Sequence, residues 1–179
     1  MEITVLRLGH RLPRDERIST HVALVARAFG ADSIIYSGQH DAGLEDSVKR
    51  ICENWGGKTS NGQFSISYEK NPVSYIKNMK KEGYSVIHAT MYGLPVQKTI
   101  REIRTKDKLL VIVGSEHVPK EIYELANFNV SVTNQPHSEV AALAILLDRI
   151  HEGKELKGFD FQGKIKIKPS AKGKTFEKR

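Results

Sequence analysis

Three segments of the sequence place small polar residues beside glycine or proline, each directly after a β-rich run. They are residues 89–95 (Ala-Thr-Met-Tyr-Gly-Leu-Pro), 114–119 (Gly-Ser-Glu-His-Val-Pro) and 133–139 (Thr-Asn-Gln-Pro-His-Ser-Glu). Glycine lets backbone N–H and C=O groups approach a ligand closely, and proline fixes the shape of a loop in advance. The three segments are therefore suited to recognising a neutral heterocycle that forms hydrogen bonds with the main chain.

The histidines and carboxylates of these segments suggest two further kinds of chemistry. His117 and His137 are accompanied by Glu116 and Glu139, but the sequence has neither H-E-x-x-H spacing nor a cysteine pair, so we predict no metal site. A nucleophilic pair of Ser138 with His137 is a second alternative. Because Ser138 opens an apolar helical pattern, its expected role is instead to cap that helix.

A second dense group of functional side chains occupies residues 9–21, called here the arginine segment. It contains Arg11, Arg14 and Arg17 together with two histidines, and it follows the first β-rich run. A guanidinium group binds phosphate through two parallel hydrogen bonds, which favours a phosphate-binding role. The alternative is a solvated loop whose arginines pair with the neighbouring acidic residues.

Two common phosphate-binding motifs are absent from the sequence. Residues 8–15, after the first β-rich run, contain a single glycine instead of G-x-G-x-x-G, and no G-x-x-x-x-G-K-[ST] occurs. A dinucleotide cradle or a Walker-type phosphate loop is therefore not expected. An adenosine-containing ligand, if bound, is expected at the three late segments.

The elements that must position these residues alternate between strands and helices. Expected strands cover residues 3–8, 33–36, 64–68, 84–88, 109–113 and 129–132. Expected helices cover residues 20–29 (with Ser19 as the cap), 44–55, 72–82, 95–104, 120–126 and 138–152. Such alternation predicts an α/β fold with a mostly parallel sheet and helices on both faces. Ligands of such sheets bind beyond the carboxyl ends of the strands, where all these segments begin.

The charge of the chain is concentrated at its end. The 179 residues carry a formal net charge of +7, whereas residues 153–179 hold nine Lys/Arg and three Asp/Glu. A basic tail on a nearly neutral globule is typical of proteins that bind a polyanion, and a purely solubilising tail is the alternative. We therefore divide the chain into a domain at residues 1–152 and a basic extension at residues 153–179.

The cellular setting follows from cysteine content and hydropathy. Cys52 is the single cysteine, so an intrachain disulfide is impossible and a reducing cytoplasm is expected. No apolar run approaches the roughly 20 residues of a membrane span, and the first residues lack a signal-peptide pattern. We expect no membrane partner.

The last expected helix predicts an assembly. Residues 140–147 contain no polar side chain, so the helix is apolar on every side over two turns. A helix of this kind is buried all round, and in so small a chain a second protomer is the natural cover. The sequence thus predicts a homodimer through this helix.

The late segments carry a resemblance to a known family. Residues 114–119 and 134–142 (Asn-Gln-Pro-His-Ser-Glu-Val-Ala-Ala) resemble the last two motifs of the SPOUT RNA methyltransferases. Matching stretches in the first thirty residues are 6–11 (Leu-Arg-Leu-Gly-His-Arg), Arg14 with Arg17, 20–24 (Thr-His-Val-Ala-Leu) and 26–30 (Ala-Arg-Ala-Phe-Gly). The combination is similar to the archaeal enzymes that methylate the 2′-oxygen of cytidine 56 in tRNA.

The resemblance implies features that composition and periodicity do not show. It implies a C-terminal trefoil knot, dimerisation through the knot, S-adenosyl-L-methionine as cofactor and the ribose of a T-loop cytidine in tRNA as substrate. The cofactor-binding residues that it implies are Ala89, Thr90, Tyr92, Gly93, Leu94, Gly114, Ser115, Glu116, His117, Val118, Val132, Thr133, Asn134, Gln135, Pro136, His137, Ser138, Glu139 and Ala142. Ala141 and Ala142 would keep the start of the helix slim, so that chain and cofactor pack closely.

The catalytic residues transfer from the family less directly. Ribose-methylating SPOUT enzymes usually carry an arginine several residues before Phe-Gly, and here Leu24 stands at about that place. We predict Arg17 as the residue that clamps phosphate and stabilises a developing alkoxide, followed by Arg14. His21 stands behind them as a candidate for the base, because an imidazole exchanges protons near neutral pH, and the identity of the base is left open.

Two other function classes are kept as alternatives. A non-enzymatic α/β RNA-binding module would use the arginine segment and the tail to hold phosphate, and would have no affinity for the cofactor. A hydrolase-like enzyme using His137 and Glu116 is disfavoured, because no nucleophile elbow is present.

Overall fold

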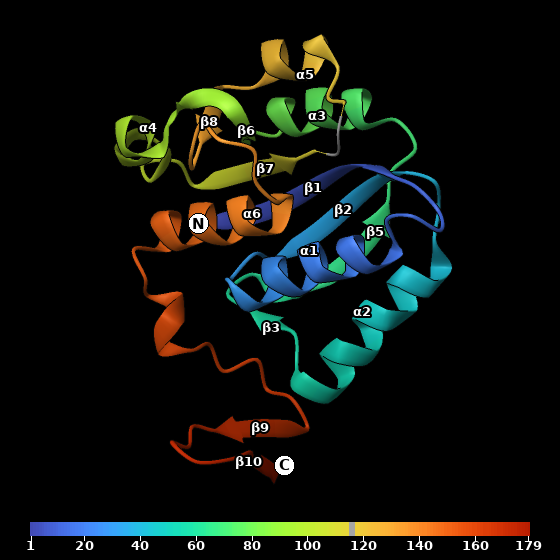
Figure 1. Cartoon of the computed structure of the whole chain (residues 1–179), viewed down its shortest axis with the longest axis vertical. Helices are drawn as coiled ribbons and strands as arrows, with labels where there is room; N and C mark the ends of the chain where they lie inside the picture. Colours follow the sequence, from blue (N-terminus) through green and yellow to red (C-terminus); the bar gives the residue numbers. More distant parts are fainter. Residues whose placement is uncertain (115–116) are drawn as a thin grey trace.

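The core of the fold is a six-stranded sheet in which neighbouring strands are parallel (Figure 1). The computed structural model describes residues 1–114 and 117–179. In spatial order the strands are β5 (Ser65–Tyr68), β2 (Ser33–Gly38), β1 (Glu2–His10), β7 (Lys108–Val113), β6 (Ser85–Pro95) and β8 (Phe128–Ser131). Alternate residues of β7 enter two separate cores, Leu109 and Val111 on one face and Leu110 and Ile112 on the other. The predicted α/β class with a parallel sheet is confirmed.

Helices cover both faces of the sheet, as the sequence predicted. The larger core receives α1 (Glu16–Ala28), α2 (Ala42–Trp55), α4 (Val96–Ile103) and α6 (Glu139–His151), and the smaller core receives α3 (Pro72–Lys81) and α5 (Lys120–Leu125). In Figure 1, α3 and α5 lie together on one side of the sheet, and α1, α2 and α6 lie on the other. None of the helices in the described ranges has the length and apolarity needed to cross a membrane.

The start of α1 differs from the prediction. The helix begins at Glu16, so Ser19 lies inside it and does not cap it. The Ser19 hydroxyl is buried 2.7 Å from Nδ1 of His10, and Nε2 of His10 lies 3.2 Å from Oδ2 of Asp41. The prediction was wrong because a serine that precedes an apolar run can equally serve a buried hydrogen bond, here one that joins the end of β1 to α1.

Residues 89–95 form strand and not the loop that the sequence predicted. β6 continues to Pro95, with an irregularity after Ala89, and Leu94 and Pro95 pair with Val130 and Ser131 of β8. The small and proline residues hid this extension from pattern analysis. A short hairpin, β3 (Lys58–Thr59) and β4 (Gly62–Gln63), was also not predicted.

The C-terminal helix α6 is buried on one side only within the single chain. Ser138 caps it, with its hydroxyl oxygen accepting from the Val140 N–H at 3.2 Å, as predicted. Its buried residues are Ala142, Leu143, Leu146, Leu147 and Ile150. Ala141 is exposed and Ile145 is 43% exposed, so one apolar stripe of the helix is left uncovered.

The basic tail is ordered and docks on the body before forming a hairpin. After the 3-10 turn η1 (Glu155–Lys157), the chain crosses to the end of α2, where Gly56 and Gln162 form a β-bridge. The hairpin consists of β9 (Ile165–Lys168) and β10 (Thr175–Lys178), which are antiparallel. Figure 1 shows this hairpin at one extremity of the molecule.

Candidate functional site

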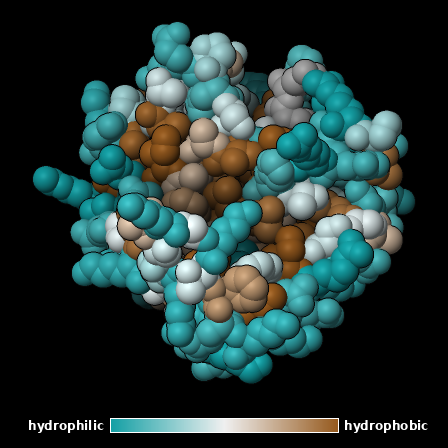
Figure 2. All heavy atoms as spheres, turned by 60° about the horizontal axis from the view of Figure 1, so that its bottom comes forward, coloured by the Kyte–Doolittle hydropathy of each residue, from teal (hydrophilic) through white to brown (hydrophobic). Residues whose placement is uncertain are grey.

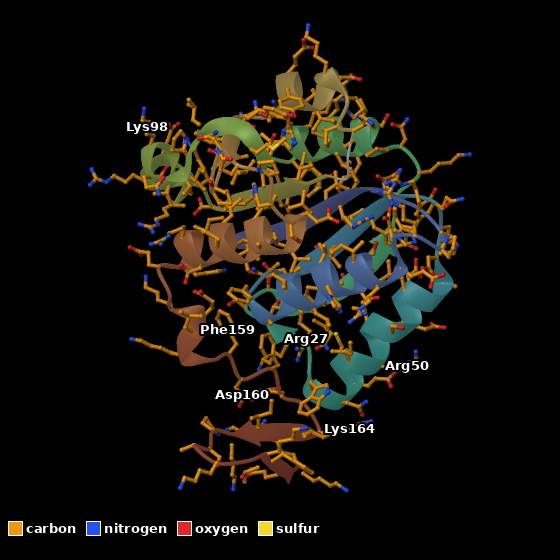
Figure 3. The ribbon with its side chains drawn as sticks, viewed as in Figure 1. Arg27, Arg50, Lys98, Phe159, Asp160 and Lys164 are labelled. Carbon is orange, nitrogen blue, oxygen red and sulfur yellow. The ribbon has the colours of Figure 1, made fainter. Side chains whose placement is uncertain are left out.

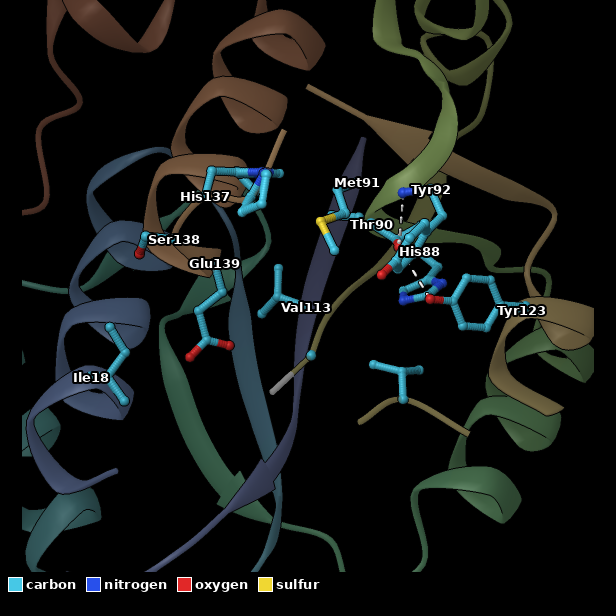
Figure 4. A pocket seen from close by; sticks show the side chains of 15 residues that line it. Ile18, His88, Thr90, Met91, Tyr92, Val113, Tyr123, His137, Ser138 and Glu139 are labelled. Carbon is cyan, nitrogen blue, oxygen red and sulfur yellow. Dashed lines mark hydrogen bonds between the residues drawn. The ribbon is translucent and has the colours of Figure 1, made fainter. Parts of the chain in front are cut away.

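A cavity of about 450 Å³ lies at the carboxyl edge of the sheet, beside the irregular part of β6, the end of β7 and the start of α6 (Figure 4). Predicted residues that line it come from all three late segments and are Ala89, Thr90, Tyr92, Gly114, Val118, Pro136, His137, Ser138, Glu139 and Ala142. The structure therefore brings together in one cavity segments that are distant in the sequence.

Other predicted cofactor residues lie outside the lining of this cavity. These are Gly93, Leu94, His117, Val132, Thr133, Asn134 and Gln135. Ser115 and Glu116 lie outside the described residues. Leu94 is instead among the exposed apolar side chains of the chain.

Five lining residues were missed by the sequence analysis: Ile18, His88, Met91, Val113 and Tyr123. His88 and Val113 are the last residues of expected strands. The rule that ligands bind beyond strand ends selects only the residues after them, so it missed both. Ile18 comes from α1 and Tyr123 from α5, and no sequence signal placed either helix beside the late segments.

The extension of β6 is clamped against β8 and the following loop. A Cβ atom on Gly93 would come within 2.5 Å of the backbone of Asn129 and Val130, so only glycine permits this approach. The Asn134 side-chain amide donates to the carbonyl oxygens of Met91 at 2.6 Å and Gly93 at 3.2 Å. Gly93 and Asn134 thus shape one wall of the cavity from behind.

A polar network supports the wall formed by β6 and α5. Nδ1 of buried His88 lies 2.9 Å from Oδ1 of Asn129, whose amide donates to the Tyr123 carbonyl oxygen at 2.9 Å. The Tyr123 ring packs edge-on against His88 with centroids 4.6 Å apart, and its hydroxyl lies 3.3 Å from that of Thr90. Burial lowers the pKa of His88. His88 is therefore a neutral wall residue at physiological pH.

The opposite wall is the beginning of α6. Nδ1 of His137 lies 2.7 Å from the Gln135 carbonyl oxygen, an acceptor, so that nitrogen carries the proton and donates. Ser138 is engaged in the helix cap, which matches its predicted structural role. Neither residue is arranged as a nucleophile with its base.

A buried charge pair connects this wall with the arginine segment. Arg7 of β1 is 1% exposed, and its Nη2 lies 3.1 Å from Oε1 of Glu139 and 3.7 Å from Oδ2 of Asp15. Burial raises the pKa of the Glu139 carboxyl, against the opposing effect of Arg7. Oε2 of Glu139 is buried and has no hydrogen-bond partner among the described residues. Glu139 thus brings an acceptor with spare capacity to the cavity.

The predicted catalytic residues are near this edge of the sheet but do not line the cavity. Arg14 is exposed, with its Nε 3.9 Å from Oδ1 of Asp15, and His21 is exposed on α1. Arg17 lines a separate depression of about 460 Å³ that includes Arg50 of α2. In the described ranges, no three His, Cys, Asp or Glu side chains group as metal ligands.

Residues 55–177 match the family described as tRNA ribose 2′-O-methyltransferase, aTrm56. The protein named tRNA (cytidine(56)-2′-O)-methyltransferase from Methanocaldococcus jannaschii is 56% identical over 178 residues, which is 98% of this chain and 96% of that protein. The chain belongs to the aTrm56 family. The protein of the same name from Methanopyrus kandleri is 49% identical over 174 residues, which is 97% of this chain and 95% of that protein.

Solved structures give the same assignment at the level of the fold. The TrmH/SpoU tRNA modifying enzyme of A. aeolicus superposes with a TM-score of 0.59 at 18% identity, over 90% of this chain and 79% of that one. The SpoU methyltransferase AviRb from Streptomyces viridochromogenes, in complex with the cofactor AdoMet, gives 0.58 at 17% identity, over 85% of this chain and 58% of that one. The aTrm56 chain therefore shares the TrmH/SpoU fold.

The extent of the family match bears on the tail. Residues 55–177 include all three late segments, β9 and all but the last residue of β10. The hairpin therefore lies within the matched part of the aTrm56 family and is not an addition peculiar to this chain.

Proposed function

We propose that this protein transfers a methyl group from S-adenosyl-L-methionine to the ribose 2′-oxygen of cytidine 56 in the T-loop of tRNA. The observation that carries the proposal is the convergence of the three late segments on one cavity, in a chain about half identical to proteins named for this reaction. We further propose that residues 1–152 form the methyltransferase domain, that residues 153–179 extend it, and that the protein acts in the cytoplasm.

The residues of the cavity fit this cofactor. A volume of about 450 Å³ lies within the range of small-molecule sites. The free carboxylate oxygen of Glu139 suits a ligand that carries positive charge, and Ala142 leaves space at the start of α6. When bound, the cofactor supplies an electrophilic methyl group on its sulfonium.

The remaining task of the protein is to place the ribose and manage its proton. Alignment of the 2′-oxygen with the methyl group can supply several kcal/mol of the barrier, about 7–11 in the best cases. Arg17, with Arg14 beside it, would hold a phosphate and stabilise the developing alkoxide, because a guanidinium stays charged and cannot act as a base at neutral pH. His21 would accept the proton.

We propose a homodimer in which the arginine segment of one protomer serves the cavity of the other. The exposed stripe of α6 with Ala141 and Ile145 supports such an interface, since these side chains are apolar and uncovered. Arg14, Arg17 and His21 stand outside the cavity of their own chain, which supports a contribution in trans. Light scattering should give twice the chain mass, and Ile145→Glu should halve it.

We also propose the C-terminal trefoil knot of the SPOUT fold. After β8, at the edge of the sheet, α6 returns to contact β6, β7, α4 and α1. The clamp of Asn134 on Met91 and Gly93 ties the returning chain to the extension of β6. Both features support a chain that passes through the loop formed by β6, α4 and β7.

The decisive experiment is methyl transfer from a radiolabelled donor to an unmodified tRNA transcript, followed by nucleotide mapping. We expect the label at nucleotide 56, and none in a matched transcript with deoxycytidine at that position. Label elsewhere, or no label, would overturn the proposal.

The alternative, a non-enzymatic RNA-binding module, predicts no cofactor affinity. A cofactor at 100 times its Kd should instead add about 2.7 kcal/mol to the free energy of unfolding.

A further inference from the structure

A second hollow, called here the tail groove, lies between the end of α2 and the hairpin. It has a volume of about 550 Å³. The side chains relevant here are aromatic or basic and are Trp55, Phe159, Phe161, Lys157, Lys166 and Arg179. Figure 3 shows Arg27 and Phe159 on the side of the body, with Asp160 and Lys164 nearer the hairpin.

The floor of the tail groove is held in place by the backbone. A Cβ atom on Gly56 would collide with the carbonyl oxygen of Phe161, so the tail approaches α2 as closely as two chains can. The Lys58 N–H donates to the same carbonyl oxygen at 3.1 Å. Two independent backbone contacts therefore fix the path of the tail beside α2.

Arg27 fixes the aromatic walls of the groove. Its Nε donates to the Gly56 carbonyl oxygen at 2.6 Å and its Nη2 to the Trp55 carbonyl oxygen at 2.7 Å. The same guanidinium lies 4.4 Å from the centroid of the Phe161 ring, within the range of a cation–π contact. One buried arginine thus holds both sides of the groove, so the walls are formed before any ligand arrives.

The aromatic rings of the groove remain accessible. Trp55 is 39% exposed and Phe159 is 38% exposed, although both lie beside a well-packed body. Phe159 and Phe161 contact each other edge-on, with centroids 5.7 Å apart. Partly exposed aromatic rings in a hollow can stack on nucleic-acid bases, an interaction worth about 1–3 kcal/mol per base.

Lys157, Lys166 and Arg179 line the groove, and the hairpin beside it carries further positive charge. Residues 164–179 contain seven Lys/Arg and one Glu. Lys168 pairs with Glu177 at 2.7 Å, and Arg179 pairs with Asp160 at 3.0 Å. The other lysines of the hairpin are exposed and are Lys164, Lys166, Lys172, Lys174 and Lys178. Figure 2, which brings this end of the molecule forward, shows apolar side chains in a hollow bordered by hydrophilic ones.

We propose that the tail groove binds an unpaired stretch of the RNA substrate, with bases on Trp55 and Phe159 and phosphates on the lysines of the hairpin. The proposal rests on the proposed function for the identity of the RNA. Within one chain the groove and the cavity are separated by the length of α6, about 20 Å for its 13 residues. The groove therefore contributes to RNA affinity and not to the methyl-transfer step.

The test compares RNA binding by four full-length proteins: the wild type, Trp55→Ala, Trp55→Phe and Lys166→Glu. The probes are an unmodified tRNA transcript and a labelled single-stranded RNA of about 12 nucleotides, which suits the span of one binding groove. Lys98→Glu on α4 is the matched control, because it makes the same charge change at an exposed site remote from the hairpin (Figure 3).

We expect Trp55→Ala to weaken binding of both probes by about tenfold, the loss of one stacked base, and Trp55→Phe to restore most of it. Lys166→Glu should weaken binding and reduce the slope of log K against log salt by about 0.7–0.9. Lys98→Glu should leave this slope much less changed. In methyl transfer the groove variants should raise the KM for tRNA and leave kcat and cofactor affinity unchanged.

Several results would overturn this inference. Unchanged RNA affinity in both Trp55→Ala and Lys166→Glu would exclude the groove as an RNA site. A change of mass in light scattering with unchanged RNA affinity would make it an interface between copies of the chain. If Trp55→Ala unfolds, Lys166→Glu alone decides, because its side chain is exposed. If the wild type shows no methyl transfer but the groove variants still lose RNA affinity, the proposed function is wrong and the groove remains an RNA site. If the wild type methylates tRNA normally and the groove variants keep their RNA affinity, the groove is not an RNA site and the proposed function stands.

Discussion

The cavity and the arginine segment lie at the same edge of the sheet, and their construction differs in kind. The cavity is lined by apolar and polar side chains and by the carboxylate of Glu139, all from the single chain. The arginine segment leaves Arg14 and Arg17 exposed and contributes only Ile18 to the cavity. The difference supports the proposal that one chain completes the site for the cofactor, whereas a partner completes the site for the RNA.

Arg7 is the physical link between these two regions. It is buried and lies against Glu139 of the cavity and Asp15 of the arginine segment. A buried charge without its partner typically costs about 3–5 kcal/mol, so the three side chains are held together as a unit. The position of the arginine segment therefore depends on the wall of the cavity, even though Arg11, Arg14 and Arg17 do not line the cavity.

The largest expected effect comes from a substitution in the arginine segment. Arg17→Ala should lower kcat for methyl transfer by about 100-fold or more, the range for losing a donor that stabilises developing negative charge. Cofactor affinity, measured by calorimetry, should not change, because Arg17 is outside the cavity. An Arg17→Ala enzyme with normal kcat would remove Arg17 from the mechanism.

The second-largest expected effect comes from a substitution in the lining of the cavity. Ala142→Leu places three extra carbon atoms into the lining and should weaken cofactor binding by about 10- to 100-fold, the equivalent of 1–3 kcal/mol of overpacking. Ala28→Leu makes the same exchange at an exposed position of α1 and is the control. Equal cofactor affinity in the two variants would show that the start of α6 does not contact the cofactor.

Mixing the two impaired proteins sharpens the comparison further. If the arginine segment acts in trans, a mixed dimer of Arg17→Ala and Ala142→Leu has one intact site. Random exchange of protomers should then restore about a quarter of wild-type activity, since half of the dimers are mixed and each has one of two sites. No recovery after verified exchange of subunits would place Arg17 and the cavity that it serves on the same chain.

The smallest effect concerns pH and distinguishes buried histidines from exposed ones. Burial lowers the pKa of His88 in the cavity wall, of His10 at the start of the arginine segment and of His151 in α6. The unfolded chain then binds more protons than the folded one below about pH 6.5, so the free energy of unfolding should fall as the pH drops through that value. The raised pKa of Glu139 has the opposite effect on the free energy of unfolding. It stabilises the folded protein at low pH, and this stabilisation is lost as the pH rises above about 4.5.

Thermal melts between pH 8 and pH 5.5 at constant ionic strength provide the measurement for this effect. His88→Gln should flatten the pH dependence, whereas His21→Gln, at an exposed position of the arginine segment, should not. A melting temperature that holds steady or rises toward pH 5.5 in the wild type would contradict the expectation.

The strands and most helices were predictable because their signals are local. Asn71 before Pro72 marked the start of α3, and Ser138 marked that of α6. The extension of β6 was not predictable, because Gly93 is required there by the backbone of β8, which lies far along the sequence. The same applies to Arg27, whose partners are Gly56 and Phe161 and which no local pattern distinguishes from a surface arginine.

The candidate site was predictable where loops follow strands and not where helices reach across to it. Pro136 and Gly114 lie where the rule for parallel sheets placed them. Ile18 and Tyr123 entered the lining only through the packing of α1 and α5, which depends on the order of strands in the sheet. Arg7 sits in an apolar strand, and its pairing with Glu139 joins residues 132 positions apart.

The contact between Gly56 and Phe161 sets a limit on how this protein can be shortened or fused. A stop codon at residue 153 would remove the Phe161 ring that packs on the guanidinium of Arg27. It would also expose the last turn of α2. A tag or fluorescent label attached directly after Arg179 would lie beside the tail groove, because Arg179 lines that groove and pairs with Asp160.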